Sequence, residues 1–439
     1  MAWVGRRYAV GAVVAVLLAG CGLRGHASEP AGAHGVVPGT ASSALSSAGG
    51  SGGRGGAAPR PGAAGSGVAP AGGASGPAPG AAVPQAAHAL PWPPSGVEVH
   101  GFRLAAACGA FCALGPGAVA VLGDGVAYPG AAPFPSAPLG VASPAPRGRR
   151  TWLTTALLWR DAAGQARTLY RVPAGWVILD AVADGRWVAI VAGPAVPDFQ
   201  SVALAARAPW SLVAVDAAGT VRNLASSSGG GDAPPPLVAL RGDRMLWAVP
   251  WVPGAADPGM EDLAAGTRRA VDLGLPAGFM IDGLGLTAAG DPLVTAGPAN
   301  AGGAGYLVRG GRPLALPMPP AAALPDGTLL GVRGGRLYTV APGAAPRRVA
   351  VVGGNVGALS VSASGGVWAL PAASGGVVVR LDPAGWRPSA YRLPKGAQIA
   401  VDGAGAAWWR AAAPPDPQAG GATALHVWWF TFAPAAAGT

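Results

Sequence analysis

A tight turn that recurs seven times, each time directly before a short apolar run, is the feature that most constrains the fold of this chain. The turn residue is aspartate or serine with a glycine beside it, a pairing that suits tight turns because aspartate bonds nearby amides and glycine accepts positive φ. The last two intervals, 326 to 364 and 364 to 402, are both 38 residues. The seven turn residues are Asp124, Asp184, Asp243, Asp291, Asp326, Ser364 and Asp402.

A repeat of this length predicts an all-β propeller, because a four-stranded propeller blade takes about 40–45 residues in the best-known case. Seven turns indicate seven blades, and six or eight stay open because the first unit is irregular. The expected blades span 99–172, 176–224, 237–273, 280–317, 321–352, 355–394 and 397–432. A β-sandwich or two unrelated β domains would be the alternative, but sandwiches lack a sustained repeat.

A second turn joins two apolar, alternating runs and predicts a β-hairpin at three places. Aspartate at its first position and glycine at its fourth suit a type I turn. The three turns are Asp161–Gly164, Asp216–Gly219 and Asp382–Gly385. The repeat resembles bacterial exported β-propellers over about three quarters of the chain. The resemblance is one of pattern only, because the sequence signatures of individual propeller families are absent, and it implies no site residues.

The segment before the repeat has a different composition. From about residue 27 to 94 it is almost wholly Gly, Ala, Pro and Ser. Such a segment cannot bury enough apolar surface to offset its conformational entropy, so we expect a disordered tether. We therefore divide the chain into a signal peptide (1–20), a lipidated N-terminus and linker (21–95), and a propeller domain (96–439).

The first residues indicate where the protein resides. Arg6 and Arg7 are followed by an apolar run to Leu18 and then by Leu-Ala-Gly-Cys, the layout of a secretory signal peptide with a cysteine at its end. These last four residues resemble the bacterial lipobox. The resemblance implies that Cys21 is acylated, which anchors the protein at the extracytoplasmic face of the cell membrane. Export by the Sec or by the twin-arginine route stays open.

The other two cysteines, Cys108 and Cys112, lie four residues apart in what we expect to be an oxidising compartment. A straight strand would hold them too far apart for a disulfide, so a bridge needs a turn at the intervening Gly109 and Ala110. A disulfide and two free thiols are both open. The net charge of +10 comes from scattered arginines, which argues against a nucleic-acid partner.

Residues for catalysis or metal binding are sparse in the propeller region. Its only histidines are His100 and His426, and neither lies in a motif for nucleophilic catalysis. A small acidic cluster of Asp257, Glu261 and Asp262 could bind Ca²⁺, although we favour a solvated loop. We expect no metal and no cofactor, and the sequence leaves enzymatic activity uncertain while leaning against it.

The best candidate for a binding surface comes from the loop lengths. If the recurring turn joins the first two strands of each blade, the irregular segments fall between the second and third strands and share one face. Long loops on a rigid scaffold commonly carry binding residues. The irregular segments are 129–150, 193–209, 253–258, 296–304, 371–376 and 411–422, and the candidate contacts are Phe134, Arg147, Arg149, Arg150, Phe199 and Trp251.

These features predict a membrane-anchored extracytoplasmic module, with a monomeric propeller domain. It would bind an envelope protein or a cell-wall polymer through the face that carries the long loops. The alternatives are a carbohydrate-active enzyme, either lyase or hydrolase, and a carbohydrate-binding module that uses exposed tryptophans.

Overall fold

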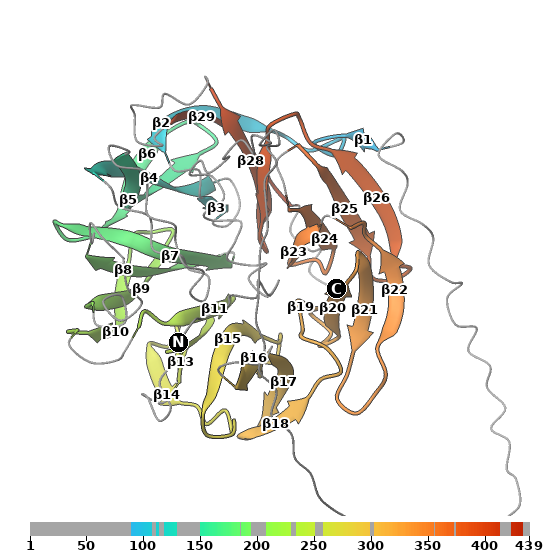
Figure 1. Cartoon of the computed structure of the whole chain (residues 1–439). Helices are drawn as coiled ribbons and strands as arrows, with labels where there is room; N and C mark the ends of the chain where they lie inside the picture. The colour runs from blue at the N-terminus through green and yellow to red at the C-terminus, as the bar shows by residue number, and fades with distance from the viewer. Residues whose placement is uncertain are drawn as a thin grey trace, which may run out of the picture. The chain divides into compact units, whose positions relative to one another are not determined.

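The part of the chain that the computed structural model describes is all β. It comprises residues 89–107, 111–113, 118–129, 150–184, 186–194, 208–229, 234–250, 258–298, 303–354, 356–372, 375–412 and 423–432. Its strands form seven sheets, which follow one another around a common centre (Figure 1). Five sheets consist of four antiparallel strands that are consecutive in sequence, and each of the other two also contains a strand from the start of the described chain. None of the described residues forms a helix that could cross a membrane. The predicted β-propeller is therefore confirmed.

We number the sheets as blades 1 to 7 in chain order. The strands of blades 1 and 2 are β3 (Phe111–Ala113), β4 (Ala118–Pro129), β5 (Arg150–Asp161), β6 (Ala166–Arg171), β7 (Trp176–Asp184), β8 (Trp187–Pro194), β9 (Trp210–Asp216) and β10 (Val221–Ser227). The strands of blades 3 and 4 are β11 (Leu237–Arg241), β12 (Arg244–Ala248), β13 (Gly259–Asp262), β14 (Thr267–Ala270), β15 (Phe279–Leu286), β16 (Pro292–Pro298), β17 (Ala304–Arg309) and β18 (Arg312–Ala315).

The last three blades are built in the same way, and two of them also take up the start of the described chain. Blades 5 and 6 hold β19 (Ala322–Ala323), β20 (Leu329–Arg333), β21 (Arg336–Val340), β22 (Arg347–Val351), β23 (Val356–Val361), β24 (Val367–Pro371), β25 (Val377–Asp382) and β26 (Arg387–Arg392), with β1 (Leu90–Pro91) added to β26. Blade 7 holds β27 (Gln398–Val401), β28 (Gly405–Ala411), β29 (Thr423–Thr431) and β2 (His100–Ala107).

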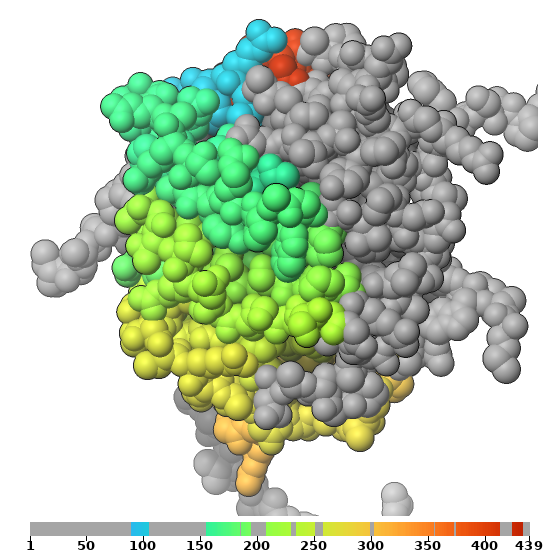
Figure 2. All heavy atoms as spheres, turned by 90° about the vertical axis from the view of Figure 1, so that its left-hand side faces the viewer, coloured from blue at the N-terminus to red at the C-terminus, as the bar shows by residue number. Residues whose placement is uncertain are grey.

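The two ends of the propeller meet in blade 7. Strand β2 pairs antiparallel with β29, and His100 lies opposite Trp429. Figure 2 shows residues at the start of β2, in blue, beside red residues of the last sheet. The predicted first blade, 99–172, is therefore wrong at its start, because residues 100–107 form the outer strand of the last blade. This pairing links strands that are more than 300 residues apart in sequence, and it covers an edge of β29 that would otherwise be free.

The turn predicted at Asp124 is also wrong. Residues 123–125 lie inside the twelve-residue strand β4, whose pairing with β5 continues on both sides, from Gly123 opposite Ala156 to Gly125 opposite Thr154. Cross-strand pairing therefore overrides the local turn preference of Asp and Gly at this site. The other six recurring turns each join the first and second strands of a blade, and the three predicted hairpins join the third and fourth strands, so these predictions are confirmed.

Seven clusters of buried side chains make up the core, one between each pair of neighbouring blades. Between blades 2 and 3, for example, Trp187 and Trp210 pack with Met245 and Trp247. The other clusters join blades 1 and 2, 3 and 4, 4 and 5, 5 and 6, 6 and 7, and 7 and 1. Since each cluster draws residues from two sheets, apolar burial between blades stabilises the closed ring.

A strap formed by residues 89–99 crosses from blade 6 to blade 7. Its strand β1 pairs in parallel with β26, and Trp92 enters the cluster between the two blades with 7% of its surface exposed. The Trp92 ring lies 5.6 Å from Trp408 and 6.0 Å from Trp368, in each case edge to face. The residues just before the predicted propeller boundary are therefore part of its packed core.

Candidate functional site

The strand order puts the two kinds of connection on opposite faces of the propeller. Strands alternate in direction, so the tight turns between strands 1 and 2 and between strands 3 and 4 share one face, which we call the turn face. The connections between strands 2 and 3 share the other, the loop face, at the positions that the sequence predicted. Blade 5 is the exception, because the turn at Gly334 and Gly335, with φ of 55° and 70°, joins its second and third strands.

Proline marks the loop face, a signal that the sequence analysis did not use. Second strands of four blades end at a proline, and in blade 3 Pro250 follows two residues after β12. Because proline has no N–H to donate, it stops the hydrogen-bond ladder where the chain leaves the sheet. The four strand-ending prolines are Pro129, Pro194, Pro298 and Pro371.

Most of the predicted binding and modification residues lie outside the residues that the structure describes. Phe134, Arg147, Arg149, Phe199 and Trp251 fall in the loop-face connections, outside the described residues. Cys21 and Cys108 also fall outside them. Cys112 lies in β3 and Arg150 begins β5, but their side chains are not among the described ones. Binding at the loop face, lipidation and a disulfide therefore stay predictions.

Two carboxylates lie near the middle of inner strands, each at or beside a β-bulge. The pairing of β7 skips one residue between Ile178 and Asp180, and that of β15 skips Asp282. Bulges re-aim side chains and recur near functional sites. The partly exposed Asp180 accepts a hydrogen bond from the Ala181 amide at 2.8 Å, while desolvation raises the pKa of its carboxyl to about 6.

Asp282 has different surroundings. A Cβ added at Gly303 would lie 2.7 Å from Asp282 Oδ2 and 2.8 Å from Thr295 Cγ2, so glycine at 303 leaves room for this carboxylate over its own sheet. Desolvation raises the pKa of the Asp282 carboxyl as well. Asp180 and Asp282 belong to blades 2 and 4 and contact different groups.

The two histidines of the propeller do not converge. They lie on the outer strands β2 and β29, away from the centre of the ring. The His100 ring contacts Trp429 at 4.7 Å, whereas the His426 ring stacks on Trp428 at 5.8 Å. Since Trp428 and Trp429 are adjacent in a strand, these two contacts lie on opposite faces of the sheet.

The two described residues of the predicted acidic cluster make separate structural contacts. Glu261 is buried, accepts a hydrogen bond from Trp247 Nε1 at 3.2 Å and pairs with Arg268 at 3.5 Å. Asp262 accepts the Ala265 amide at 2.8 Å and so caps its turn. Asp257 lies outside the described residues. Within the described ranges, no group of three or more His, Cys, Asp or Glu side chains is placed to hold a metal ion.

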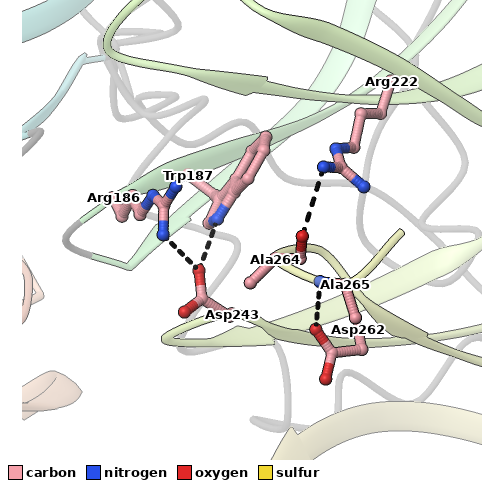
Figure 3. Close-up of polar contacts among 7 residues, drawn as sticks. All are labelled: Arg186, Trp187, Arg222, Asp243, Asp262, Ala264 and Ala265. Atoms are coloured by element: carbon pink, nitrogen blue, oxygen red, sulfur yellow. Dashed lines mark hydrogen bonds and ion pairs between the residues drawn. The ribbon is translucent and has the colours of Figure 1, made fainter. Parts of the chain in front are cut away.

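Polar contacts connect the tight turns of neighbouring blades on the turn face. Figure 3 shows Arg186 Nη1 and Trp187 Nε1 of blade 2 both pointing to Asp243 Oδ1 of blade 3, at 3.3 and 2.8 Å. In the same view Arg222 Nη2 reaches the Ala264 carbonyl at 3.4 Å. Much of the hydrogen-bonding capacity of these turns is therefore used within the propeller.

Further close contacts on this face include two between blades that are not neighbours. Arg241 Nη1 of blade 3 donates to the Ala323 carbonyl of blade 5 at 2.8 Å. Asp184 of blade 2 accepts the Gly242 amide at 2.8 Å, and a Cβ at Gly403 of blade 7 would lie 2.6 Å from its Oδ1. Desolvation raises the pKa of Asp184, while the Gly242 hydrogen bond and Arg241 act to lower it. The turn-face end of the ring is thus crossed by close contacts.

Taken together, the fold and these contacts define a seven-bladed propeller whose turns are tied together on one face and whose long connections leave from the other. No family model matches the chain, and no curated protein matches it.

Among the solved structures that are similar to this chain in part are the following three. YCF48 bound to D1 peptide is 11% identical, with a TM-score of 0.42 over 80% of this chain and 100% of that chain. A catalytically inactive virginiamycin B lyase from Staphylococcus aureus with quinupristin is 11% identical, with a TM-score of 0.41 over 75% and 98% of the two chains. Oligogalacturonate lyase in complex with manganese is 16% identical, with a TM-score of 0.33 over 46% of this chain and only 62% of that one. Likeness at this level carries no argument about ligand or activity.

Proposed function

We propose that this protein is a lipid-anchored extracytoplasmic interaction module that binds an envelope protein or a cell-wall component through its loop face. The observation that carries the proposal is the division of connections between the two faces. Four of the seven connections between second and third strands have ten or more residues, and all seven connections leave from the loop face. The turn face instead uses its side chains and carbonyls for contacts between blades. A rigid ring that displays variable segments on one face is suited to recognition.

The anchoring half of the proposal rests on Cys21 after its basic and apolar leader. Two acyl chains on one cysteine give stable membrane association, whereas one chain gives only marginal binding. The Cys21→Ser variant should move from the membrane fraction to the soluble fraction of fractionated cells. A Cys112→Ser variant, which leaves the leader intact, should stay in the membrane. Membrane retention of Cys21→Ser would contradict the anchor.

The binding half is tested by crosslinking in cells that express the full-length protein, followed by mass spectrometry. The wild type should capture one dominant envelope protein or wall fragment. A variant in which a Gly-Ser segment of equal length replaces residues 133–146 should lose that capture while its unfolding temperature stays within a few degrees. Since such a replacement could disturb folding, Phe134→Ala and Arg147→Ala serve as milder changes. Undiminished capture by all three variants would exclude the connection between β4 and β5 as the binding segment of the loop face.

A further inference from the structure

A row of three basic side chains, two arginines and a histidine, runs across three of the four strands of blade 7. Arg103 on β2 lies directly opposite His426 on β29, and His426 lies directly opposite Arg410 on β28. Residues directly opposite in an antiparallel sheet point to the same face. Neighbouring strands are about 4.8 Å apart, so the two arginine backbones are separated by roughly 10 Å with the imidazole between them.

The row lacks an acidic counterpart among the residues that the structure describes. No described ion pair or hydrogen bond joins Arg103, His426 or Arg410 to a carboxylate, whereas Arg186 and Arg309 elsewhere pair with aspartates at 3.3 and 3.0 Å. Both arginines of the row are exposed. The two arginines repel each other across β29, so this arrangement costs stability within the protein alone. Departures of this kind are expected where a ligand supplies the compensation.

Aromatic contacts hold two members of the row in place. His426 stacks on the indole of Trp428, and the guanidinium carbon of Arg410 lies 5.4 Å from the centre of the same ring. Trp428 in turn stacks on the buried Trp408 at 6.2 Å. A cation held over an indole face is oriented but keeps its full charge, so it can still bind an anion.

Glycine at position 101 makes room for this aromatic platform. Gly101 lies opposite Trp428, and a Cβ there would stand 2.9 Å from Trp428 Cδ1 and 3.3 Å from its Nε1. The indole therefore lies across β2 and β29 beside the basic row, and it is partly exposed. The surface combines an apolar ring with guanidinium groups, which match carboxylates in a bidentate geometry.

We propose that the blade 7 row of Arg103, His426 and Arg410, with Trp428 beside it, binds an acidic polysaccharide. The arginines contact successive carboxylates of the polymer, and the partly exposed indole packs against a sugar ring. A polymer of phosphates offers negative charges but no sugar ring that could pack against the indole. The indole therefore favours an acidic polysaccharide. This site is separate from the loop face, and the two proposals can therefore fail independently.

The test measures binding of the purified full-length protein, kept in a non-ionic detergent, to immobilised polygalacturonate, polyphosphate and dextran. At about 0.15 M salt, exposed charges more than about 8 Å apart are largely screened, which limits non-specific attraction. The Arg103→Gln/Arg410→Gln variant should bind polygalacturonate at least about tenfold more weakly than wild type. The matched control is Arg312→Gln/Arg387→Gln, which removes two exposed positive charges from other blades. It should bind within about twofold of wild type.

Two more measurements separate the polymer's charge from its sugar. Polyphosphate should bind more weakly than polygalacturonate. Trp428→Phe should weaken polygalacturonate binding several-fold and leave polyphosphate binding unchanged. Dextran should not bind, because it is neutral. Equal losses in the two double variants would show that net charge alone is responsible and would overturn the site. Tighter binding to polyphosphate than to polygalacturonate, or no binding to either, would also overturn it.

Discussion

The indole of Trp247 lies directly over Gly259, its partner on the neighbouring strand. A Cβ added at Gly259 would stand 2.8 Å from Trp247 Cζ2, closer than real Cβ atoms come to another heavy atom. The same ring donates its Nε1 hydrogen to buried Glu261 at 3.2 Å and carries the guanidinium of Arg268 over its face at 4.7 Å. Gly101 and Trp428 repeat this relationship in blade 7, so glycine opposite tryptophan is a recurring packing device of this propeller.

Gly259→Ala should therefore destabilise the protein. The added methyl group forces the indole off the strand and disturbs its bond to Glu261, and overpacking of this kind costs about 1–3 kcal/mol. The measurement is the free energy of unfolding in urea. Gly354→Ala is the control, because a Cβ there meets nothing within 4 Å and the backbone φ is not positive. Equal stability of the two variants would contradict the packing role.

Trp92→Ala should weaken the seam between blades 6 and 7. Removing a buried tryptophan costs about 3–5 kcal/mol, and here the ring contacts Trp368, Tyr391, Trp408 and Phe430. Unfolding in urea should begin at a lower concentration than in wild type. Leu90→Ala, two residues earlier on the same strap, removes a side chain that is 54% exposed and should change little. An unchanged midpoint for Trp92→Ala would show that the strap does not stabilise the ring.

Asp243→Ala should cost more than Arg186→Ala. Asp243 accepts the indole hydrogen of Trp187, a residue that is only 1% exposed, and a buried donor left without a partner costs about 1–3 kcal/mol. The pair with Arg186 is largely exposed, so its loss costs at most about 1 kcal/mol. Chemical denaturation of both single variants checks the order. The reverse order would mean that the ion pair, and not the indole bond, joins the two turns.

Asp180→Asn should stabilise the protein near neutral pH. Desolvation raises the pKa of Asp180 to about 6 in the folded state, so between about pH 4 and 6 the folded state holds more proton than the unfolded state. Stability therefore falls as pH rises through this window, and the cost that persists above it is at most about 3 kcal/mol. Asparagine removes the charge and keeps an oxygen for the Ala181 amide.

The unfolding temperatures of Asp180→Asn and wild type should accordingly differ at pH 7.5 and converge near pH 4. The control is Asp326→Asn at an exposed turn, where the carboxylate caps the Thr328 amide at 2.8 Å. That change should not produce a stability gain that depends on pH in this way. A variant that is no more stable than wild type at pH 7.5 would contradict the desolvation of Asp180.

The sequence was most informative where structure depends on neighbouring residues. Asp161 accepts the amide of Gln165 at 2.8 Å, and Asp216 accepts that of Thr220 in the same way, so each hairpin turn is specified within five residues. The tight turns and the position of the long connections follow from such local chemistry. The turn predicted at Asp124 is wrong because the pairing of β4 with β5 outweighs the local preference of Asp and Gly for a turn.

The candidate sites depend on more distant relationships. The row formed by Arg103, His426 and Arg410 joins residues separated by more than 300 positions, and no local pattern marks them as neighbours. The same is true of Asp184 and its contacts with Gly242 and Gly403 from two other blades. The loop-face residues chosen from sequence, such as Phe134 and Phe199, stay predictions because they lie outside the described residues.

The all-β class, the repeat and the faces on which short and long connections emerge could be predicted from the residues alone, because alternation, aspartate and glycine act within one strand or one turn. That β2 completes blade 7 and that Trp92 belongs to the core became clear from the folded ring. Ring closure brings the two ends of the domain together, and the free energy of that pairing comes from apolar surface that no local segment can bury alone.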